Sequence, residues 1–337
     1  MQYDKEIAIS TGRSRKEKNW KNGTVLWSAF VERLSKEHRT AETFAEYMKA
    51  DKARQDEIKD VGGFVGGTLA DGRRKAGTVV ARSLITLDAD SADLHLWDDW
   101  LLYYGSAAAC YSTHKYSPEK PRLRLVVPTD RDMLPDEYEP CARRVASVLG
   151  INQFDDTTYE AERLMYWPST PRDAEYYFRS SDAPFLRVDD LLTTYRDWHD
   201  ASEWPVSDRM DRAVRREIKK QADPLEKPGV VGAFCRTYGI HHAIATFLSD
   251  VYEPCTVENR YTYIPGSTAA GLIVYDDKFA YSHHGTDPTS GMLCNAFDLV
   301  RVHLFGDRDE NVERNGTRKD RYPSFIAMEE LACRDKE

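Results

Sequence analysis

Apolar and polar positions follow two periodicities along about the first 190 residues of the chain. Apolar residues recur every three to four positions where we expect helices, and they alternate or run together where we expect strands. The helical pattern covers residues 27–36, 41–59, 94–105 and 135–150. The strand pattern covers residues 78–90, 107–114, 122–128 and 163–169. Helices that alternate with short strands predict an α/β (α+β) fold, a sheet covered by helices, although the pattern does not fix the strand order.

Beyond this region the pattern changes, and it predicts a different organisation. Residues 196–230 read as a charged helix followed by a linker that is broken at Pro228-Gly229. Residues 231–306 predict a small accessory module made of a helix, a β-hairpin over residues 271–284 and a second helix. Residues 307–337 predict a polar tail that ends in a helix. We therefore expect the first domain to cover residues 1–195.

Composition narrows the class of protein. Hydrophobic residues make up 41% of the 337 positions and charged residues 31%, which suits a soluble globular protein. No apolar run is long enough to span a bilayer, and the first ten residues lack the apolar core of a signal peptide. The six cysteines form no CxxC pair, which predicts a cytoplasmic protein with neither a disulfide framework nor a zinc ribbon. The net charge of −9 means that any site for a polyanion must be local.

A pair of carboxylates ends the strand predicted over residues 78–90. Asp88 and Asp90 are two positions apart, so their side chains emerge on the same face of that strand. Carboxylates placed side by side repel one another and need a compensating cation or donor. Oxygen ligands of this kind suit Mg²⁺ or Mn²⁺. A D-x-D pair is also common on protein surfaces, so the pair alone does not establish a metal site.

The next two predicted strands carry groups that suit phosphate. Ser112 and His114 are again two positions apart, and both side chains can donate to phosphate oxygens. Lys120, Arg122 and Arg124 follow, and the two arginines share one strand face. Arginine binds phosphate through two parallel hydrogen bonds. The alternative is that these arginines pair with the nearby aspartates and close the sheet.

A third set lies in residues 154–169. Asp155 and Asp156 are predicted to close an apolar strand, and Arg163 to open the next one. Three strand ends would then carry D-x-D, S-x-H and an aspartate with an arginine. The combination indicates a phosphate-handling site more strongly than any one of its parts.

These residues carry a family resemblance. LITLDAD, YSTH and FDD, in this order and spacing, resemble the three motifs of the archaeo-eukaryotic primase superfamily. The flanking KPRLRLVVP and YEAERLMYWPS are similar to the primase-polymerase region of phage-related virulence-associated protein E family proteins. The resemblance covers about residues 1–190 and extends more loosely through residues 233–255 and 280–291.

The resemblance implies a fold, a reaction and a role for each residue. It implies a primase-polymerase core with a mixed sheet flanked by helices, which makes or extends an oligonucleotide on a single-stranded DNA template from dNTP or NTP. Asp88, Asp90 and Asp155 would hold two Mg²⁺ or Mn²⁺ ions, Asp155 being preferred to Asp156 because it lies eight residues before Arg163. The groups implied to contact the nucleotide phosphates or the template are Ser112, His114, Lys120, Arg122, Arg124 and Arg163. If the chain is a fragment, a helicase-type ATPase would follow in the longer protein.

Two other functions fit the same residues. A two-metal nuclease or phosphohydrolase would use the aspartates to activate water, whereas a replication-initiator module would bind DNA without catalysis. The glycine-rich segment 61–77 lacks the GK[ST] ending of a nucleotide-hydrolase loop, so its glycines either approach a nucleotide or make turns. The basic group of Arg73, Arg74 and Lys75 either touches template or triphosphate, or forms a solvated turn.

Overall fold

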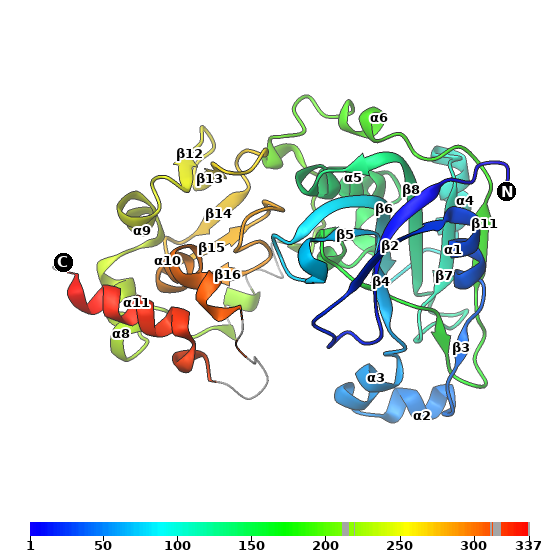
Figure 1. The fold of residues 1–337 in the computed structure, drawn as a ribbon, viewed down its shortest axis with the longest axis horizontal. Coiled ribbons are helices and arrows are strands. Elements are labelled where there is room, and N and C mark those ends of the chain that lie inside the picture. Colours follow the sequence, from blue (N-terminus) through cyan, green and yellow to red (C-terminus); the bar gives the residue numbers. More distant parts are fainter. Residues whose placement is uncertain (211–215, 219, 311, 313–317, 336–337) are drawn as a thin grey trace. The chain divides into compact units, whose positions relative to one another are not determined.

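The computed structural model describes residues 1–210, 216–218, 220–310, 312 and 318–335 (Figure 1). The chain forms two compact units: Met1–Arg196 with Trp204–Ser207, and Asp197–Glu203 with Asp208–Glu337. The charged helix expected within residues 196–230 falls partly outside the described residues. Within the described part of the chain, no helix has the length and apolar character needed to cross a membrane.

The first unit is built on antiparallel sheets, and helices pack on them, which confirms the predicted α/β class. The main sheet has the strand order β11-β7-β8-β6-β5. Its strands are β5 (Gly67–Leu69), β6 (Val79–Ala89), β7 (Ala108–Ser112), β8 (Leu123–Met133) and β11 (Phe178–Ser181). A second sheet consists of β2 (Lys21–Leu26), β1 (Glu6–Gly12), β4 (Gly63–Val65) and β9 (Met165–Tyr166). A short parallel pair joins β3 (His38–Arg39) to β10 (Ser169–Thr170).

Helices complete the first unit. They are α1 (Trp27–Leu34), α2 (Phe44–Lys49), α3 (Lys52–Ile58), α4 (Leu96–Tyr103), α5 (Pro135–Val148) and α6 (Val188–Leu192). Single 3-10 turns occur at η1 (Ala70–Gly72), η2 (Ile151–Gln153) and η3 (Asp156–Tyr159). The one long helix predicted over residues 41–59 is wrong, because α2 and α3 are separate. Ala50 is extended with a ψ of 149°, and the Asp51 carboxylate accepts a hydrogen bond from the Arg54 N–H, so it caps a new helix.

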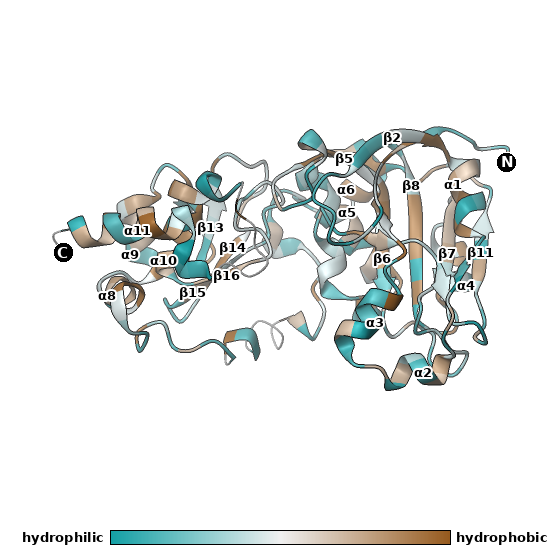
Figure 2. Ribbon diagram, turned by 60° about the horizontal axis from the view of Figure 1, so that its bottom comes forward, coloured by the Kyte–Doolittle hydropathy of each residue, from teal (hydrophilic) through white to brown (hydrophobic). Residues whose placement is uncertain are grey.

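A hydrophobic core holds the two larger sheets and α1 together. Phe30 from α1, Phe64 from β4 and Val126 from β8 all belong to it and are buried. Strand β8 is hydrophobic along much of its length (Figure 2), and α5 packs against β6. The central β6–β8 pair is therefore fixed by burial as well as by its hydrogen bonds.

The glycines of the 61–77 segment let strands approach one another. A Cβ on Gly67 would lie 2.0 Å from the Ala81 carbonyl oxygen, and a Cβ on Gly63 would lie 2.5 Å from the Met165 carbonyl oxygen. These residues sit in β5 and β4, where each pairs with a neighbouring strand. Gly63 and Gly67 therefore serve strand packing, Gly62, Gly72 and Gly77 lie outside the strands with positive φ, and no glycine of the segment lines the pocket described below.

The second unit surrounds its own antiparallel sheet. The strand order is β12 (Tyr252–Pro254), β13 (Arg260–Tyr263), β14 (Leu272–Tyr275), β15 (Phe279–Ser282) and β16 (Leu293–Cys294), so the predicted hairpin is the β14–β15 part of a larger sheet. Its helices are α8 (Gly229–Thr237), α9 (Ile240–Phe247), α10 (Ala296–Phe305) and α11 (Pro323–Arg334), with 3-10 turns η4 (Ala201–Glu203), η5 (Gly306–Asp309) and η6 (Lys319–Arg321). Met328 of α11 is fully buried in this unit's core, so the helix near the end of the chain is an integral part of the unit.

Candidate active site

Pairing of β6 with β8 brings the acidic and basic motifs together. The two strands are antiparallel, and their register places Asp88 opposite Arg124. The Arg124 Nε lies 3.5 Å from the Asp88 Oδ2. Two positions further along the same face, the Arg122 Nη1 donates to the Asp90 Oδ1 over 2.6 Å. A D-x-D motif thus faces an R-x-R motif across two antiparallel strands, as the alternative interpretation of the arginines expects.

Asp155 joins this pair from a different kind of element than predicted. Its backbone N–H donates to the Asp88 carbonyl oxygen over 2.8 Å, and its Oδ2 lies 3.2 Å from the Arg163 Nη2. The strand predicted to end at Asp155 is wrong, because the 3-10 turns η2 and η3 flank this residue. Gly150, with a φ of 92°, ends α5, and the chain turns at once instead of extending. Asp156 points elsewhere, and its Oδ1 accepts from the Ser207 hydroxyl.

Asp88 is the most perturbed acid of the group. Burial raises its pKa, the charge of Arg124 opposes this, and the carboxylates of Asp90 and Asp155 raise the pKa further. The Asp88 Oδ1 is buried and has no hydrogen-bond partner among the described residues. A buried carboxylate oxygen without a donor is a position where a cation is favourable.

His114 is held on two sides in the same pocket. Its Nε2 lies 3.0 Å from the Glu42 Oε1, and its Nδ1 lies 2.9 Å from the Ser169 Oγ. Burial lowers the pKa of His114, against the opposing effect of Glu42, so the neutral ring is favoured. Because a carboxylate only accepts, we assign the proton to Nε2, and Nδ1 then accepts from the Ser169 hydroxyl. Both ring nitrogens are engaged, so a phosphate would have to replace one of these partners.

Two of the predicted phosphate ligands lie outside the pocket. Ser112 is fully buried, and its hydroxyl accepts from the Tyr177 N–H. Strand β7 ends at Ser112, so the alternation expected to place it beside His114 no longer applies. Lys120 is exposed in the turn before β8 and does not line the pocket.

A pocket of about 560 Å³ collects the remaining candidates: Asp88, Asp90, His114, Arg122, Arg124, Asp155 and Arg163. Its lining includes nine Lys or Arg side chains and only four Asp side chains. The lining also includes residues without a predicted role at the site, namely Arg15, Lys16, Tyr47, Lys52, Asp56, Lys59, Thr113, Lys115, Leu164, Tyr166 and Ser169. Arg74 lines the pocket as well, whereas its neighbours Arg73 and Lys75 do not. The basic composition of residues 11–22 was the only sequence signal for part of this set.

The donor set fits a divalent cation that shares its ligands with a substrate. Asp88 and Asp90 present oxygen atoms on one strand face, and the Asp88 Oδ1 lacks a donor in the described structure. Within the described residues, no three His, Cys, Asp or Glu side chains lie close enough to hold a metal ion by themselves. Mg²⁺ commonly takes one or two carboxylates and completes its shell with water and phosphate oxygens. The residues therefore suit that arrangement better than an all-protein cage.

The first unit is thus an α/β domain whose central strand pair presents carboxylates and arginines to a cation-lined pocket. The model of the family described as the VapE N-terminal domain matches residues 1–207, more than half of the chain. The chain belongs to this family. The resemblance to virulence-associated protein E family proteins is thereby confirmed.

Comparison with solved structures finds a viral domain. The chain is similar to the AEP domain of the cyanophage S-2L primase-polymerase (PrimPol), with 15% sequence identity and a TM-score of 0.31. The match covers 55% of this chain and 86% of that domain. A likeness this weak carries no argument about activity. No curated protein matches the chain.

Proposed function

We propose that the first unit is a template-dependent nucleotidyltransferase, a DNA primase or polymerase that joins nucleotides on single-stranded DNA. The observation that carries this proposal is the meeting of Asp88, Asp90 and Asp155, each beside an arginine, in a pocket with surplus positive charge. Carboxylates that attract a cation and cations that attract phosphate are both needed to bind a nucleoside triphosphate.

Asp88 and Asp90, with Asp155 beside them, are the residues that would hold Mg²⁺ or Mn²⁺. When bound, such a cation offsets the charge of the triphosphate and favours loss of the proton from the attacking hydroxyl. The reaction forms a bond between the primer 3′-oxygen and the α-phosphorus. It breaks the bond from that phosphorus to the β-phosphate, and pyrophosphate leaves with the electron pair.

The arginines of the site supply the complementary charge. Arg122, Arg124 and Arg163 now face carboxylates, and a bound triphosphate offers each of them a second acceptor. Glu42 and Ser169 fix the ring of His114 at the wall of the pocket, so the imidazole contributes a rigid boundary beside the phosphates. Fixed groups of this kind stabilise charge without reorganising during the reaction.

The test is nucleotide incorporation. The protein is incubated with single-stranded DNA, with and without a primer, and with labelled dNTP or NTP and either Mg²⁺ or Mn²⁺. We expect extended or new strands from the parent and a loss of at least about 100-fold from the Asp88→Asn/Asp90→Asn variant. The matched control is Asp98→Asn, which neutralises an exposed acid on α4 outside the pocket.

The products separate this function from the other two. Labelled strands that depend on Asp88 and Asp90 support a polymerase, and their appearance without a primer identifies a primase. Shortened DNA instead of extended DNA would replace the proposal with a nuclease. If the protein is folded and the DNA is neither extended nor cut, the function that remains supported is that of a DNA-binding module without catalysis. The helicase-type ATPase in a longer chain stays a prediction.

A further inference from the structure

Positive charge is unevenly spread over the pocket. On the wall formed by β6, β8 and η3, each of Asp88, Asp90 and Asp155 faces one arginine. The remaining lining cations come from the loop after β1, from α3, from the turn before β6 and from the loop after β7: Arg15, Lys16, Lys52, Lys59, Arg74 and Lys115. Asp56 is the one acid among the described lining residues that faces them. The surplus positive charge therefore lies away from the predicted catalytic acids.

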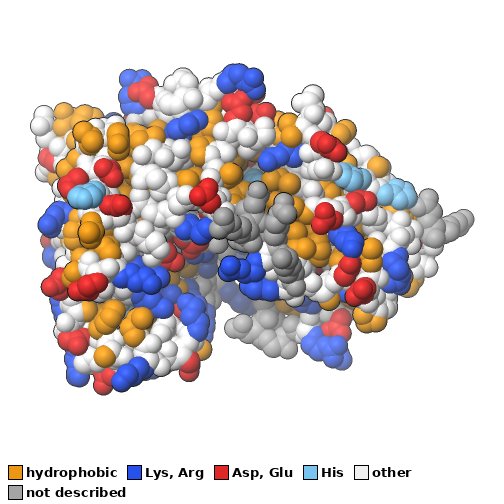
Figure 3. Space-filling view, turned by 180° about the vertical axis from the view of Figure 1, so that it is seen from behind, with side chains coloured by type: hydrophobic (Ala, Val, Ile, Leu, Met, Phe, Trp, Pro, Cys, Tyr) orange, Lys and Arg blue, Asp and Glu red, His pale blue; other side chains and the backbone are white. Residues whose placement is uncertain are grey.

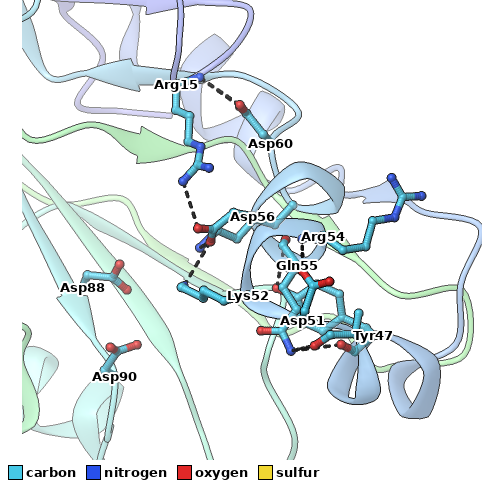
Figure 4. Close-up of polar contacts among 12 residues, drawn as sticks. Arg15, Tyr47, Asp51, Lys52, Arg54, Gln55, Asp56, Asp60, Asp88 and Asp90 are labelled. Carbon is cyan, nitrogen blue, oxygen red and sulfur yellow. Dashed lines mark hydrogen bonds and ion pairs between the residues drawn. The ribbon is translucent and has the colours of Figure 1, made fainter. Parts of the chain in front are cut away.

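Asp56 organises part of this set, as Figure 4 shows for Arg15 and Lys52. The Asp56 carboxylate lies 3.0 Å from the Arg15 Nη1, 3.0 Å from the Lys52 Nζ and 2.9 Å from the Lys59 Nζ. Lys52, Asp56 and the C-cap residue Lys59 are spaced so that they share one face of α3. Although burial alone would raise the pKa of Asp56, hydrogen bonds from Lys59 and Lys52 lower it well below its usual range. One ionised carboxylate thus positions three cations.

The loop that carries Arg15 is fixed as well. The Ser14 hydroxyl donates to the Asp60 Oδ2 over 2.7 Å, and the Arg15 backbone N–H donates to the Asp60 carboxylate over 3.0 Å. These bonds tie the loop after β1 to the residues just beyond α3. Cations fixed before a ligand arrives lose less conformational entropy on binding.

The cluster has more positive charge than its acid can offset. Within the described part of the chain, Lys16, Arg74 and Lys115 form no ion pair with an acid. Burial lowers the pKa of Lys115, and the charges of Lys52 and Arg122 lower it further. Burial also lowers the pKa of Lys59, and the charge of Lys52 adds to this against the effect of Asp56. An anion bound among these side chains would offset the cost of burying their charges and would reduce the repulsion between them.

We propose that Arg15, Lys52 and Lys59, gathered around Asp56 and joined by Lys115, form a phosphate-binding site separate from the arginines of β8. The ligand chemistry is a chain of phosphates, supplied either by the backbone of a DNA strand or by a nucleoside triphosphate. Lysines act as point charges, so they suit phosphates that are read without regard to sequence. This inference rests on the proposed function, because it assigns the phosphates of that reaction's substrates to a second wall of the pocket.

Figure 3 shows Lys and Arg side chains gathered on the lower part of the first unit, over the region that α2 and α3 form.

Lys52 has an exposed side chain, and Asp56 keeps Arg15 and Lys59 when Lys52 is removed. Lys52→Ala therefore changes the proposed site without emptying it. The matched control is Lys49→Ala, which removes an exposed lysine at the end of the neighbouring helix α2, outside the pocket.

The experiment measures binding to a fluorescent single-stranded oligothymidylate by anisotropy over a series of salt concentrations. EDTA is present, so that no divalent cation bridges DNA to the aspartates. A parallel arm measures displacement of the oligonucleotide by dTTP and, separately, direct calorimetric binding of dTTP. We expect Lys52→Ala to weaken binding several-fold and to reduce the slope of log affinity against log salt by about 0.7 per lost contact to a single strand.

The outcomes distinguish the sources. If Lys52→Ala loses affinity for the oligonucleotide alone, the ligand is the backbone of a DNA strand. If it loses affinity for dTTP alone, the ligand is the triphosphate, and a loss of affinity for both supports a shared site. Affinities and slopes equal to those of Lys49→Ala for both ligands overturn the proposal. If binding depends on Lys52 and survives in the Asp88→Asn/Asp90→Asn variant, but the protein incorporates no nucleotide, only the proposed polymerase function is contradicted. If binding does not depend on Lys52 and the protein incorporates nucleotides normally, only the proposed phosphate site is contradicted.

Discussion

Two half-buried carboxylates, Glu160 and Glu162, lie in the loop that connects η3 to β9. Burial, with the charges of Glu162 and Asp155, raises the pKa of Glu160 to about 7, against the opposing effect of Arg163. Burial also raises the pKa of Glu162. The folded protein therefore keeps a proton on Glu160 over a pH range in which the unfolded chain has already released it.

The sign of the resulting pH dependence follows from this shift. The folded pKa lies above the unfolded value of 4.5, so the stability linked to Glu160 is fully present below pH 4.5 and is lost as pH rises toward 7. We expect Glu160→Gln to raise the melting temperature by a few degrees at pH 8 and to leave it unchanged at pH 4. Thermal unfolding followed by circular dichroism checks this. Glu119→Gln, at an exposed position, is the control. An equal shift at both pH values would contradict the assignment.

Single-residue patterns predicted part of the site. Strand alternation predicts that Asp88 and Asp90 lie together and that Arg122 and Arg124 do, and the ion pairs Asp88–Arg124 and Asp90–Arg122 agree with this, although Asp90 and Arg122 lie just beyond the ends of β6 and β8. Alternation fails for Ser112, because a shared face requires the strand to continue and β7 ends there. The interaction of Asp56 with Arg15 joins residues 41 positions apart, and no local pattern encodes a contact of that kind.

At the scale of elements, the short helices α2 and α3 depend on their caps. Thr43 and Glu46 form a capping box at the start of α2, and Asp51 caps α3. Periodicity alone merges the two helices, because the apolar positions continue across residues 50 and 51. The local hydrogen bonds of Asp51 separate them, and this break starts α3 at Lys52.

The cap of α3 gives a prediction for this element. Asp51→Ala removes the acceptor of the Arg54 N–H, so we expect the free energy of unfolding of the first unit to fall by about 1 kcal/mol. Asp51→Asn keeps an acceptor oxygen and should lose only a small part of this. Chemical denaturation of both variants provides the comparison. If the alanine and asparagine variants lose the same stability, the side chain does not act as a cap.

At the scale of the whole molecule, each of the two compact units has a hydrophobic core of its own among the described residues. One includes Phe30 and Phe64 with residues of β1, β6 and β8, and the other includes Ile244, Leu272 and Phe297. The two cores share no residue, and each lies within one compact unit. Apolar burial that is divided in this way supplies each unit with its own driving force for folding.

Two thermal transitions are therefore expected in calorimetry. Phe30→Ala should lower the free energy of unfolding of the first unit by about 3–5 kcal/mol, and Ile244→Ala should lower that of the second unit by about 2–5 kcal/mol. Each variant should lower one transition and leave the other in place, because its cavity opens in one core only. The two variants serve as controls for each other. A single transition that both substitutions lower would show that the units unfold together.

The register between β6 and β8 has a consequence for how this family can change in length. Asp88 pairs with Arg124, and the flanking Leu87 and Ala89 lie opposite Leu125 and Leu123. Insertion of one residue between Leu84 and Asp88 would turn the acids toward the core and Ala89 toward the pocket. The irregularity between Arg82 and Leu84 already takes up a shift on the far side of that stretch. Natural insertions and deletions should therefore gather in the loops on either side of α4 and in the turn before β6, and spare the four positions that lead to Asp88.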